Sequence, residues 1–178
     1  ITEGLALEFY RRIGLAVKDQ FIEMKKLKGI LVGGPGPTKE SFLRDALIPT
    51  PILKKVIGVK DIGYTDEYGL QVLVELSQDL LAEQELTKER ELLKIFFTAL
   101  GKNIEKVAYG EAEVRKALKA AAVDKLYLSK DLKRPIMDEF REEALAAGTD
   151  VVFISTETDE GKQFKGLGGI GALLRFAF

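Results

Sequence analysis

The first 28 residues carry the hydrophobic pattern of an amphipathic helix. A stripe of large apolar residues recurs every four positions: Leu5, Phe9, Ile13, Val17 and Phe21. Such a spacing places its members on one side of an α-helix, and most of the basic side chains of this segment lie off the stripe. We therefore predict a helix from Glu3 to Lys28, which packs through this stripe.

The pattern breaks at Gly29, and a short run of apolar residues, Gly29–Val32, has the character of a buried strand. The following Gly33–Pro37 is too rich in glycine and proline for regular structure, so it predicts a turn. We expect Thr38 to cap a helix that runs through Leu43. Pro49 and Pro51 then indicate a loop.

A second strand is predicted at Val56–Val59, and residues 69–98 are largely helical in pattern. Their charged middle, Glu83–Arg90, is polar enough to predict an exposed joint between two helical segments. We place the boundary between two domains there.

The second half starts a new alternation of strands and helices. After a helix that ends near Gly101, the predicted elements are a strand Lys106–Tyr109, a helix Glu111–Ala121, a strand Val123–Leu128, a helix Ile136–Ala147, a strand Val151–Ile154, a helix Asp159–Lys165 and a strand Ala172–Phe178. Alternation in both halves indicates two small α/β domains, each a short mixed sheet packed with helices. Residues 1–85 form the first domain and residues 90–178 the second.

The amino-acid composition excludes several kinds of catalytic and binding site. Of the 178 residues 46% are hydrophobic and 31% charged, a balance that suits a globular chain with a core. There is no cysteine and no histidine, which removes disulfides, Ser-His and Cys-His catalysis, and ordinary zinc sites. The net charge of −1 gives no general attraction to bare nucleic acid. The apolar runs are too short for a membrane span.

Two glycine-rich stretches suggest nucleotide sites but lack essential parts. In the first, Thr38 precedes Lys39 and Glu40 follows it, whereas a P-loop needs Gly-Lys followed by Ser or Thr. Gly166–Gly171 matches G-x-G-x-x-G, yet too few residues follow it for the helix and acidic residue of a dinucleotide site. A structural turn is the better interpretation of both, and we expect no cofactor.

The carboxylates near Tyr64, namely Asp61, Asp66 and Glu67, have oxygen ligands for a hard cation but not the spacing of a calcium loop. We interpret them as a solvated turn and expect no metal. Asp159 and Glu160 are expected to cap and charge the start of the last helix.

Six segments, in the same order along the chain, resemble the archaeal and eukaryotic class-1 peptide chain release factors: Glu8–Gly14, Gly29–Glu40, Asp61–Leu70, Tyr109–Leu118, Ser155–Gln163 and Gly168–Phe176. The resemblance covers nearly the whole chain. It implies a cytoplasmic translation termination factor with a codon-reading domain, a middle domain carrying a Gly-Gly-Gln loop, and a C-terminal α/β domain. By this resemblance the chain begins just beyond that loop.

The resemblance also implies partners. In this family the C-terminal domain docks an elongation factor 1-alpha-like translational GTPase and later the ribosome-recycling ATPase, and the middle domain contacts tRNA and rRNA on the ribosome. The GTPase-contacting motif falls on the tail residues Ala172, Leu173, Leu174, Arg175 and Phe176. The apolar members are expected to bury against the partner or the domain's own sheet, and Arg175 to make a charge-assisted contact.

Basic side chains of the first domain are candidates for contact with RNA phosphates: Arg11, Arg12, Lys25 and Lys26. A solvated helix face explains such a run equally simply, and more commonly.

The sequence also departs from the family pattern. It contains no Gly-Gly-Gln tripeptide and no codon-reading region, so these 178 residues are not expected to promote peptidyl-tRNA hydrolysis unaided, and the chain is not itself an enzyme. It opens with Ile1 rather than Met, and we expect it to be part of a longer protein. Family members often carry an insert in the C-terminal domain, whereas Leu128 here runs through Lys133 directly into the next helix.

Two other functions compete with a termination factor. A Pelota-type ribosome-rescue factor shares the C-terminal domain and lacks the Gly-Gly-Gln loop. We rank it second because Gly63–Gly69 and Ser155–Thr158 resemble the termination factor more closely. A standalone RNA-binding module built on the second half would need a basic face, which the charge balance does not favour.

Overall fold

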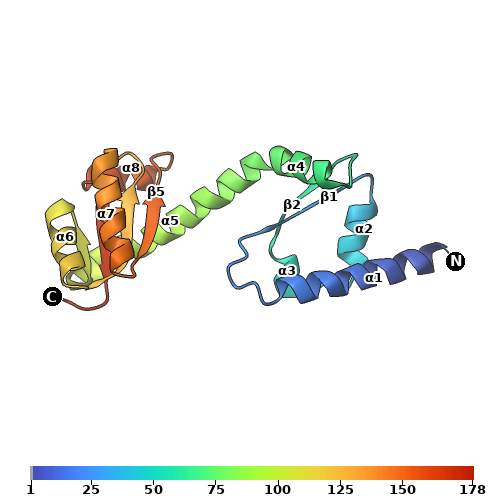
Figure 1. Ribbon diagram of the computed structural model, residues 1–178, viewed down its shortest axis with the longest axis horizontal. Coiled ribbons are helices and arrows are strands. Elements are labelled where there is room, and N and C mark those ends of the chain that lie inside the picture. The colour runs from blue at the N-terminus through green and yellow to red at the C-terminus, as the bar shows by residue number, and fades with distance from the viewer. Residues whose placement is uncertain (1) are drawn as a thin grey trace. The chain divides into compact units, whose positions relative to one another are not determined.

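The computed structural model describes residues 2–178 and divides the chain into two compact units, Ile1–Ala82 and Glu83–Phe178 (Figure 1). The first unit holds α1 (Thr2–Phe21), β1 (Ile30–Gly34), α2 (Thr38–Asp45), α3 (Thr50–Leu53), β2 (Val56–Asp61) and α4 (Glu67–Leu76). A long helix, α5 (Gln78–Lys102), begins in this unit and continues into the second. Each unit combines a sheet with helices, which confirms the predicted α/β class.

In the first unit β1 and β2 form a parallel pair, with Leu31 opposite Gly58 and Gly34 opposite Asp61. The buried core comprises Ala46, Ile48 and Ile52, against which α1 and α2 pack. At Gly14 a Cβ atom would lie 2.1 Å from the carbonyl oxygen of Ala46. Only glycine allows α1 to approach the end of α2 this closely.

The predicted first helix is too long, since α1 ends at Phe21. Tyr10, Val17 and Phe21 pack on the core, whereas Ile22 and Met24 beyond them are 42% and 46% exposed. The chain therefore has no buried stripe to continue the helix, and it makes tight turns between Phe21 and Leu27. Leu5 and Phe9, expected on the packed stripe, are also largely exposed.

Three further local predictions are corrected. Thr38 does not cap α2: it is the first residue of the helix, and Pro37 before it provides no side-chain hydrogen bond. The loop around Pro49 contains the short helix α3, because proline is accepted in the first turn of a helix. Residues 83–90 are no joint: they lie inside α5, and the two helical segments meet at Ser77 instead. Glu, Gln, Leu, Lys and Arg dominate residues 83–90, and these residues have high helix propensity.

The second unit has three layers. Its elements are η1 (Ile104–Lys106), β3 (Val107–Tyr109), α6 (Glu111–Lys119), β4 (Val123–Ser129), α7 (Arg134–Ala146), β5 (Asp150–Ile154), α8 (Asp159–Gly166) and β6 (Ile170–Leu174). The strand order is β3-β6-β4-β5, with β4 and β5 parallel and β6 antiparallel to both of its neighbours. The sheet is therefore mixed, as predicted.

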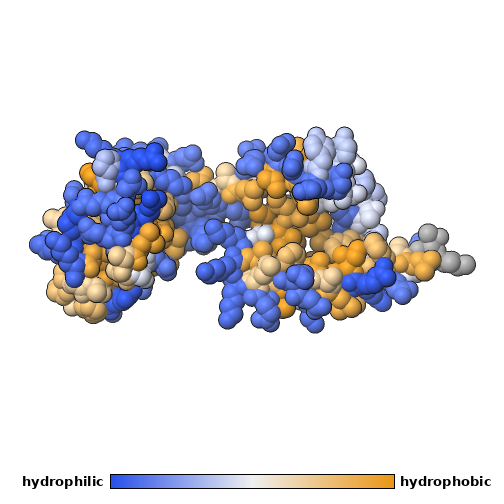
Figure 2. All heavy atoms as spheres, viewed as in Figure 1, coloured by the Kyte–Doolittle hydropathy of each residue, from blue (hydrophilic) through white to orange (hydrophobic). Residues whose placement is uncertain are grey.

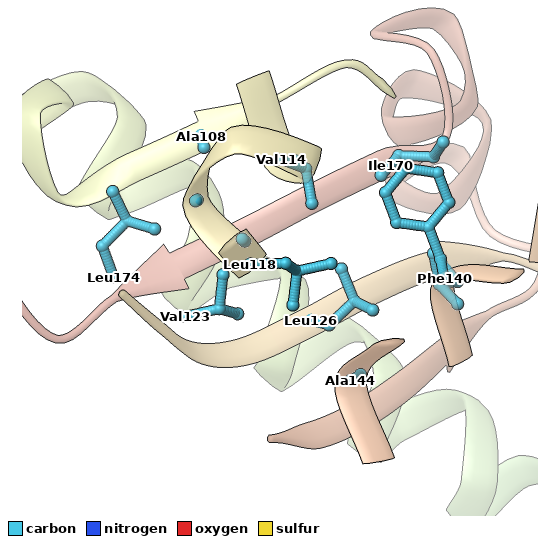
Figure 3. Close-up of a cluster of buried hydrophobic side chains, with 12 residues drawn as sticks. Ala108, Val114, Leu118, Val123, Leu126, Phe140, Ala144, Ile170 and Leu174 are labelled. Carbon is cyan, nitrogen blue, oxygen red and sulfur yellow. The ribbon is translucent and has the colours of Figure 1, made fainter. Parts of the chain in front are cut away.

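Alternate residues of the strands point to opposite faces, and each face has its own core. Leu126 and Leu128 of β4 face α6 and α7, where Val114, Leu118 and Phe140 are buried with them (Figure 3). The other face of the sheet packs on α5 and α8. There the main buried side chains are Leu93, Phe96, Tyr127, Ile154 and Phe164.

The glycine-rich segment before the last strand is the tight turn that the sequence predicts. Gly168 and Gly169 have φ values of +107° and +70°, a region that favours glycine. At Gly171 a Cβ atom would lie 2.8 Å from the ring of Phe96. Backbone and aromatic ring thus pack directly against each other, and β6 ends at Leu174 rather than Phe178 because no strand pairs beyond that residue.

Burial gives the second unit a pH dependence at high pH. The phenol of Tyr127 is fully buried and donates a hydrogen bond to the carbonyl of Leu92 at 3.1 Å, and burial raises its pKa to about 12. In the unfolded chain this group loses its proton near its ordinary pKa of 10. Between the two values only the folded state keeps the proton, so the stabilisation is present below pH 10 and is lost as the pH rises towards 12.

We therefore expect the free energy of unfolding of the native chain to fall more steeply between pH 10 and pH 12 than that of Tyr127→Phe. Urea titrations at a series of pH values measure the difference. Parallel curves for the two proteins over this interval would contradict the assignment.

Candidate partner-binding surface

The tail motif singled out in the sequence divides into a buried and an exposed part. Ala172 is fully buried and Leu174 is 8% exposed, both in the core on the α6 and α7 side. Leu173 points to the opposite face and packs on the second core. Of the two possibilities that the sequence leaves open for these apolar residues, the structure therefore shows burial against the domain's own sheet.

Arg175 and Phe176 come directly after β6 and lie on the surface. The amide of Arg175 donates to the carbonyl of Ala122 at 2.7 Å, which fixes its backbone beside the start of β4. Its Nε atom is 3.9 Å from Oδ1 of Asp124, and both side chains are largely exposed. Phe176 and Phe178 are 49% and 57% exposed. We call Asp124, Arg175, Phe176 and Phe178 the tail surface.

This arrangement can provide both elements of a protein contact. The guanidinium of Arg175 is only just within ion-pair distance of Asp124, so it keeps hydrogen-bond donors for a second carboxylate. The half-exposed ring of Phe176 is a typical anchor of a protein interface. The ordered backbone of Arg175 limits the entropy lost on binding.

A polar network lies where the parallel strands β4 and β5 end. Glu89 of α5 is 5% exposed; its Oε2 accepts a hydrogen bond from the amide of Ser155 at 2.9 Å, and its Oε1 accepts one from Nζ of Lys130 at 3.1 Å. Burial lowers the pKa of Lys130, but the hydrogen bond and charge of Glu89, together with Glu85, outweigh it and raise that pKa.

Nearby, Asp131 accepts hydrogen bonds from Lys165 at 3.1 Å and Thr156 at 3.0 Å. These two contacts lower the pKa of Asp131. Thr158, not Asp159, caps α8 by accepting from the amide of Gly161, while Asp159 and Glu160 lie in its first turn. The members of the network around Glu89 and Asp131 come from four separate segments, and no local pattern in the sequence connects them.

The structure does not gather the four basic candidates of the first unit into one site. All four are exposed. Arg11 and Arg12 lie near the middle of α1, about 15 Å of helix rise before its end, whereas Lys25 and Lys26 follow that end. The guanidinium of Arg12 lies over the ring of Phe9, 5.6 Å from its centroid.

The first glycine-rich stretch is a structural turn, as interpreted. Lys39, the residue that a phosphate site would need, is 6% exposed and donates hydrogen bonds to the carbonyl of Gly36 and to Asp61. The hydrogen bond with Asp61 raises the pKa of Lys39. Asp66 caps α4 by accepting from the amide of Gly69 at 3.0 Å. The two aspartates of the acidic turn thus have separate structural roles.

The described part of the chain holds neither a metal-ligating cluster nor a membrane-spanning helix. Among residues 2–178, no three acidic, cysteine or histidine side chains come together in a way that could bind a metal ion. None of the helices described combines the length and the apolar character needed to span a bilayer.

Comparisons with known proteins identify the class. The family described as eRF1 domain 2 matches residues 1–83, and the one described as eRF1 domain 3 matches residues 86–178. The two units thus define a protein of the translation termination class. The chain belongs to the eRF1 family, the archaeal and eukaryotic class-1 peptide chain release factors.

The peptide chain release factor subunit 1 of Thermococcus kodakarensis is 37% identical over 226 residues, which cover 99% of this chain and 54% of that protein. The chain spans about half the length of the curated relatives that it matches. Because the alignment is longer than 178 residues, the relative has residues within this span that the chain lacks.

Two solved structures show how widely the fold is shared. The C-terminal domain of a peptide chain release factor from Methanosarcina mazei is 33% identical with a TM-score of 0.55, and the match covers 64% of this chain and 98% of that domain. A structure of ribosome-bound archaeal Pelota with ABCE1 has a TM-score of 0.71 over 96% of this chain and 49% of the other, at 24% identity. The second likeness shows the fold alone.

Proposed function

We propose that this chain is the middle and C-terminal portion of a translation termination factor, which recognises stop codons and triggers peptidyl-tRNA hydrolysis on the ribosome. Residues 1–85 are the part of the middle domain that follows the Gly-Gly-Gln loop, and residues 90–178 dock an elongation factor 1-alpha-like translational GTPase. The observation that carries this proposal is the exposed pair Arg175 and Phe176 on the ordered end of β6, within the unit that matches eRF1 domain 3.

In this proposal the five tail residues have different roles. Ala172, Leu173 and Leu174 hold β6 in the sheet and thereby position the two exposed residues after the strand. Arg175 reaches a carboxylate of the GTPase, and Phe176 packs into an apolar depression of it. Aromatic and arginine side chains commonly dominate the binding energy of such contacts.

The remaining partners are those that the family implies. The factor acts on the ribosome in the cytoplasm, and its C-terminal domain also contacts the ribosome-recycling ATPase. The ribosome-bound archaeal Pelota, which shares this fold and is described together with ABCE1, supports this contact. Arg11, Arg12, Lys25 and Lys26 contact tRNA or rRNA phosphates. Hydrolysis itself occurs in the ribosomal peptidyl transferase centre, so the intact factor acts as an activator of that centre and not as an enzyme.

We expect Arg175→Ala to weaken binding to the GTP form of an elongation factor 1-alpha-like GTPase about tenfold, because truncation removes a charge-assisted contact at the centre of the tail surface. Isothermal titration calorimetry with the intact chain measures the effect. Lys119→Ala, which removes an exposed charge from the end of α6, is the matched control. Failure of the unmodified chain to bind the GTPase at all would refute the docking proposal.

A Pelota-type ribosome-rescue factor is the alternative, because Pelota proteins share the fold of this chain. Both functions use the same class of GTPase, so binding does not separate them. The full-length protein does: a termination factor releases peptide from ribosomes halted at a stop codon, whereas a rescue factor only splits stalled ribosomes.

A further inference from the structure

The turn between β2 and α4 exposes two tyrosine rings that pack edge to face. Tyr64 and Tyr68 are 53% and 55% exposed, and their ring centroids lie 4.9 Å apart. The backbone beneath them is ordered. A Cβ atom at Gly69 would collide with the carbonyl oxygen of Tyr64, and Asp66 caps α4 through the amide of Gly69. The fold therefore holds this aromatic pair in solvent.

Apolar side chains of α4 extend the exposed aromatic pair. Leu70 is 64% exposed and lines the same cavity of about 330 Å³ as Tyr64 does. Val74 lies one helical turn further along α4 and is 45% exposed. Figure 2 shows side chains of intermediate hydropathy next to strongly hydrophilic ones around the start of α4. We call Tyr64, Tyr68, Leu70 and Val74 the tyrosine surface; a contiguous group of this kind is typical of a binding site.

The tyrosine surface lies in a negatively charged segment. Residues 61–79 contain five carboxylates and neither lysine nor arginine. Within residues 2–178 only one of the five, Asp61, forms an ion pair, and its partner Lys39 is buried. Asp66 and Glu67, between the two tyrosines in sequence, are exposed. The N-terminus of α4 carries about half a positive charge, which these two carboxylates exceed.

Aromatic rings beside uncompensated carboxylates suit a cation with a planar face. A guanidinium group can stack on a tyrosine ring and at the same time donate hydrogen bonds to a carboxylate. The methylene groups of an arginine side chain can pack on Leu70 and Val74. The carboxylates repel nucleic acids and acidic membranes. The charge of the tyrosine surface thus selects a basic protein partner.

We propose that the tyrosine surface binds an arginine-containing basic segment of a partner protein. The inference goes beyond the proposed function, because it involves neither the tail surface nor the basic residues of the first unit. Guanidinium groups of the partner stack on Tyr64 and Tyr68, and their N–H groups donate to Asp66 and Glu67. Oδ2 of Asp66 serves this contact, since Oδ1 caps α4.

The test uses the 178-residue chain and a fluorescein-labelled peptide of alternating arginine and serine, with binding followed by fluorescence anisotropy. Tyr68→Ala should bind the peptide about fivefold more weakly, because it removes one ring of the pair. Glu67→Gln should weaken binding about threefold, and this loss should shrink at high salt. A version of the peptide with lysine in place of arginine should bind the unmodified chain about threefold more weakly, since an ammonium group lacks a planar face.

Each substitution has a matched control. Tyr109→Ala removes a tyrosine of the second unit that is 44% exposed, and Glu91→Gln removes an exposed carboxylate of α5. Both controls should bind the peptide as the unmodified chain does. Circular dichroism checks that all four variants fold.

Other results would overturn the inference. Absence of binding to the unmodified chain would mean that the tyrosine surface does not take basic segments. An unchanged affinity in Tyr68→Ala, or equal losses in Glu67→Gln and Glu91→Gln, would mean that net charge alone attracts the peptide. Tighter binding of an uncharged peptide of leucine and serine would mean that the surface takes an apolar partner instead.

Discussion

Replacing Phe96 by alanine should lower the free energy of unfolding of the second unit by about 4 kcal/mol. The ring is fully buried in the core between α5 and the sheet. Its centroid lies 5.3 Å from that of Tyr127 and 5.5 Å from that of Phe164. Alanine would leave a cavity that these rings can fill only in part, because Gly171 has no side chain to move into it. Urea unfolding followed by circular dichroism measures the loss.

Ile95→Ala is the control for this substitution. Ile95 is the preceding residue of the same helix but is 54% exposed, so its truncation should cost no more than about 0.5 kcal/mol. Similar losses for the two variants would show that α5 does not pack on the sheet as described. Because Gly171 lies in β6, the Phe96 variant should also loosen the strand that positions the tail surface.

Replacing Glu89 by alanine should cost about 2 kcal/mol of unfolding free energy. The substitution leaves the buried amide of Ser155 without its acceptor and Lys130 without its closest carboxylate. Lys130 is itself 42% exposed and can turn to water, which limits the cost. The same urea titrations detect the change, and the loss should be nearly the same at high and low salt because Glu89 is buried.

Glu85→Ala serves as the comparison. Its carboxylate is 69% exposed and 3.5 Å from Lys130, so we expect an effect below about 0.5 kcal/mol. If Glu89→Ala were as harmless as Glu85→Ala, the amide of Ser155 would have another partner in solution, and the network would not stabilise the unit.

The alternating pattern of strands and helices could be predicted, because burial on both faces of a sheet imposes a regular spacing on the sequence. The C-terminal end of α1 and the continuity of α5 could not be predicted from the sequence. Whether the helix continues through Ile22 depends on whether another element buries that side chain. Residues 83–90 have the composition of a solvated segment, and only the folded structure shows that Glu89 among them contacts the residues after β4 and β5. Tertiary contacts decide such cases, not local propensity.

The candidate sites, too, could be predicted from the sequence only in part. The resemblance located the tail motif, but the sequence could not say which of its residues are exposed, because that depends on the register of β6 beside β4. The side chain of Arg175 is exposed because its strand has already ended at Leu174.

The position of β6 has a consequence for how this protein is made. It is the last strand of the second unit in sequence, yet it lies between β3 and β4. While a ribosome is still synthesising the chain, β3 has no neighbour in the sheet, and the inner edge of β4 is bare until Ile170–Leu174 emerges. The first unit has both of its strands much earlier. The nascent chain should therefore fold from the N-terminal side, and its second unit should need chaperone protection until synthesis has passed β6.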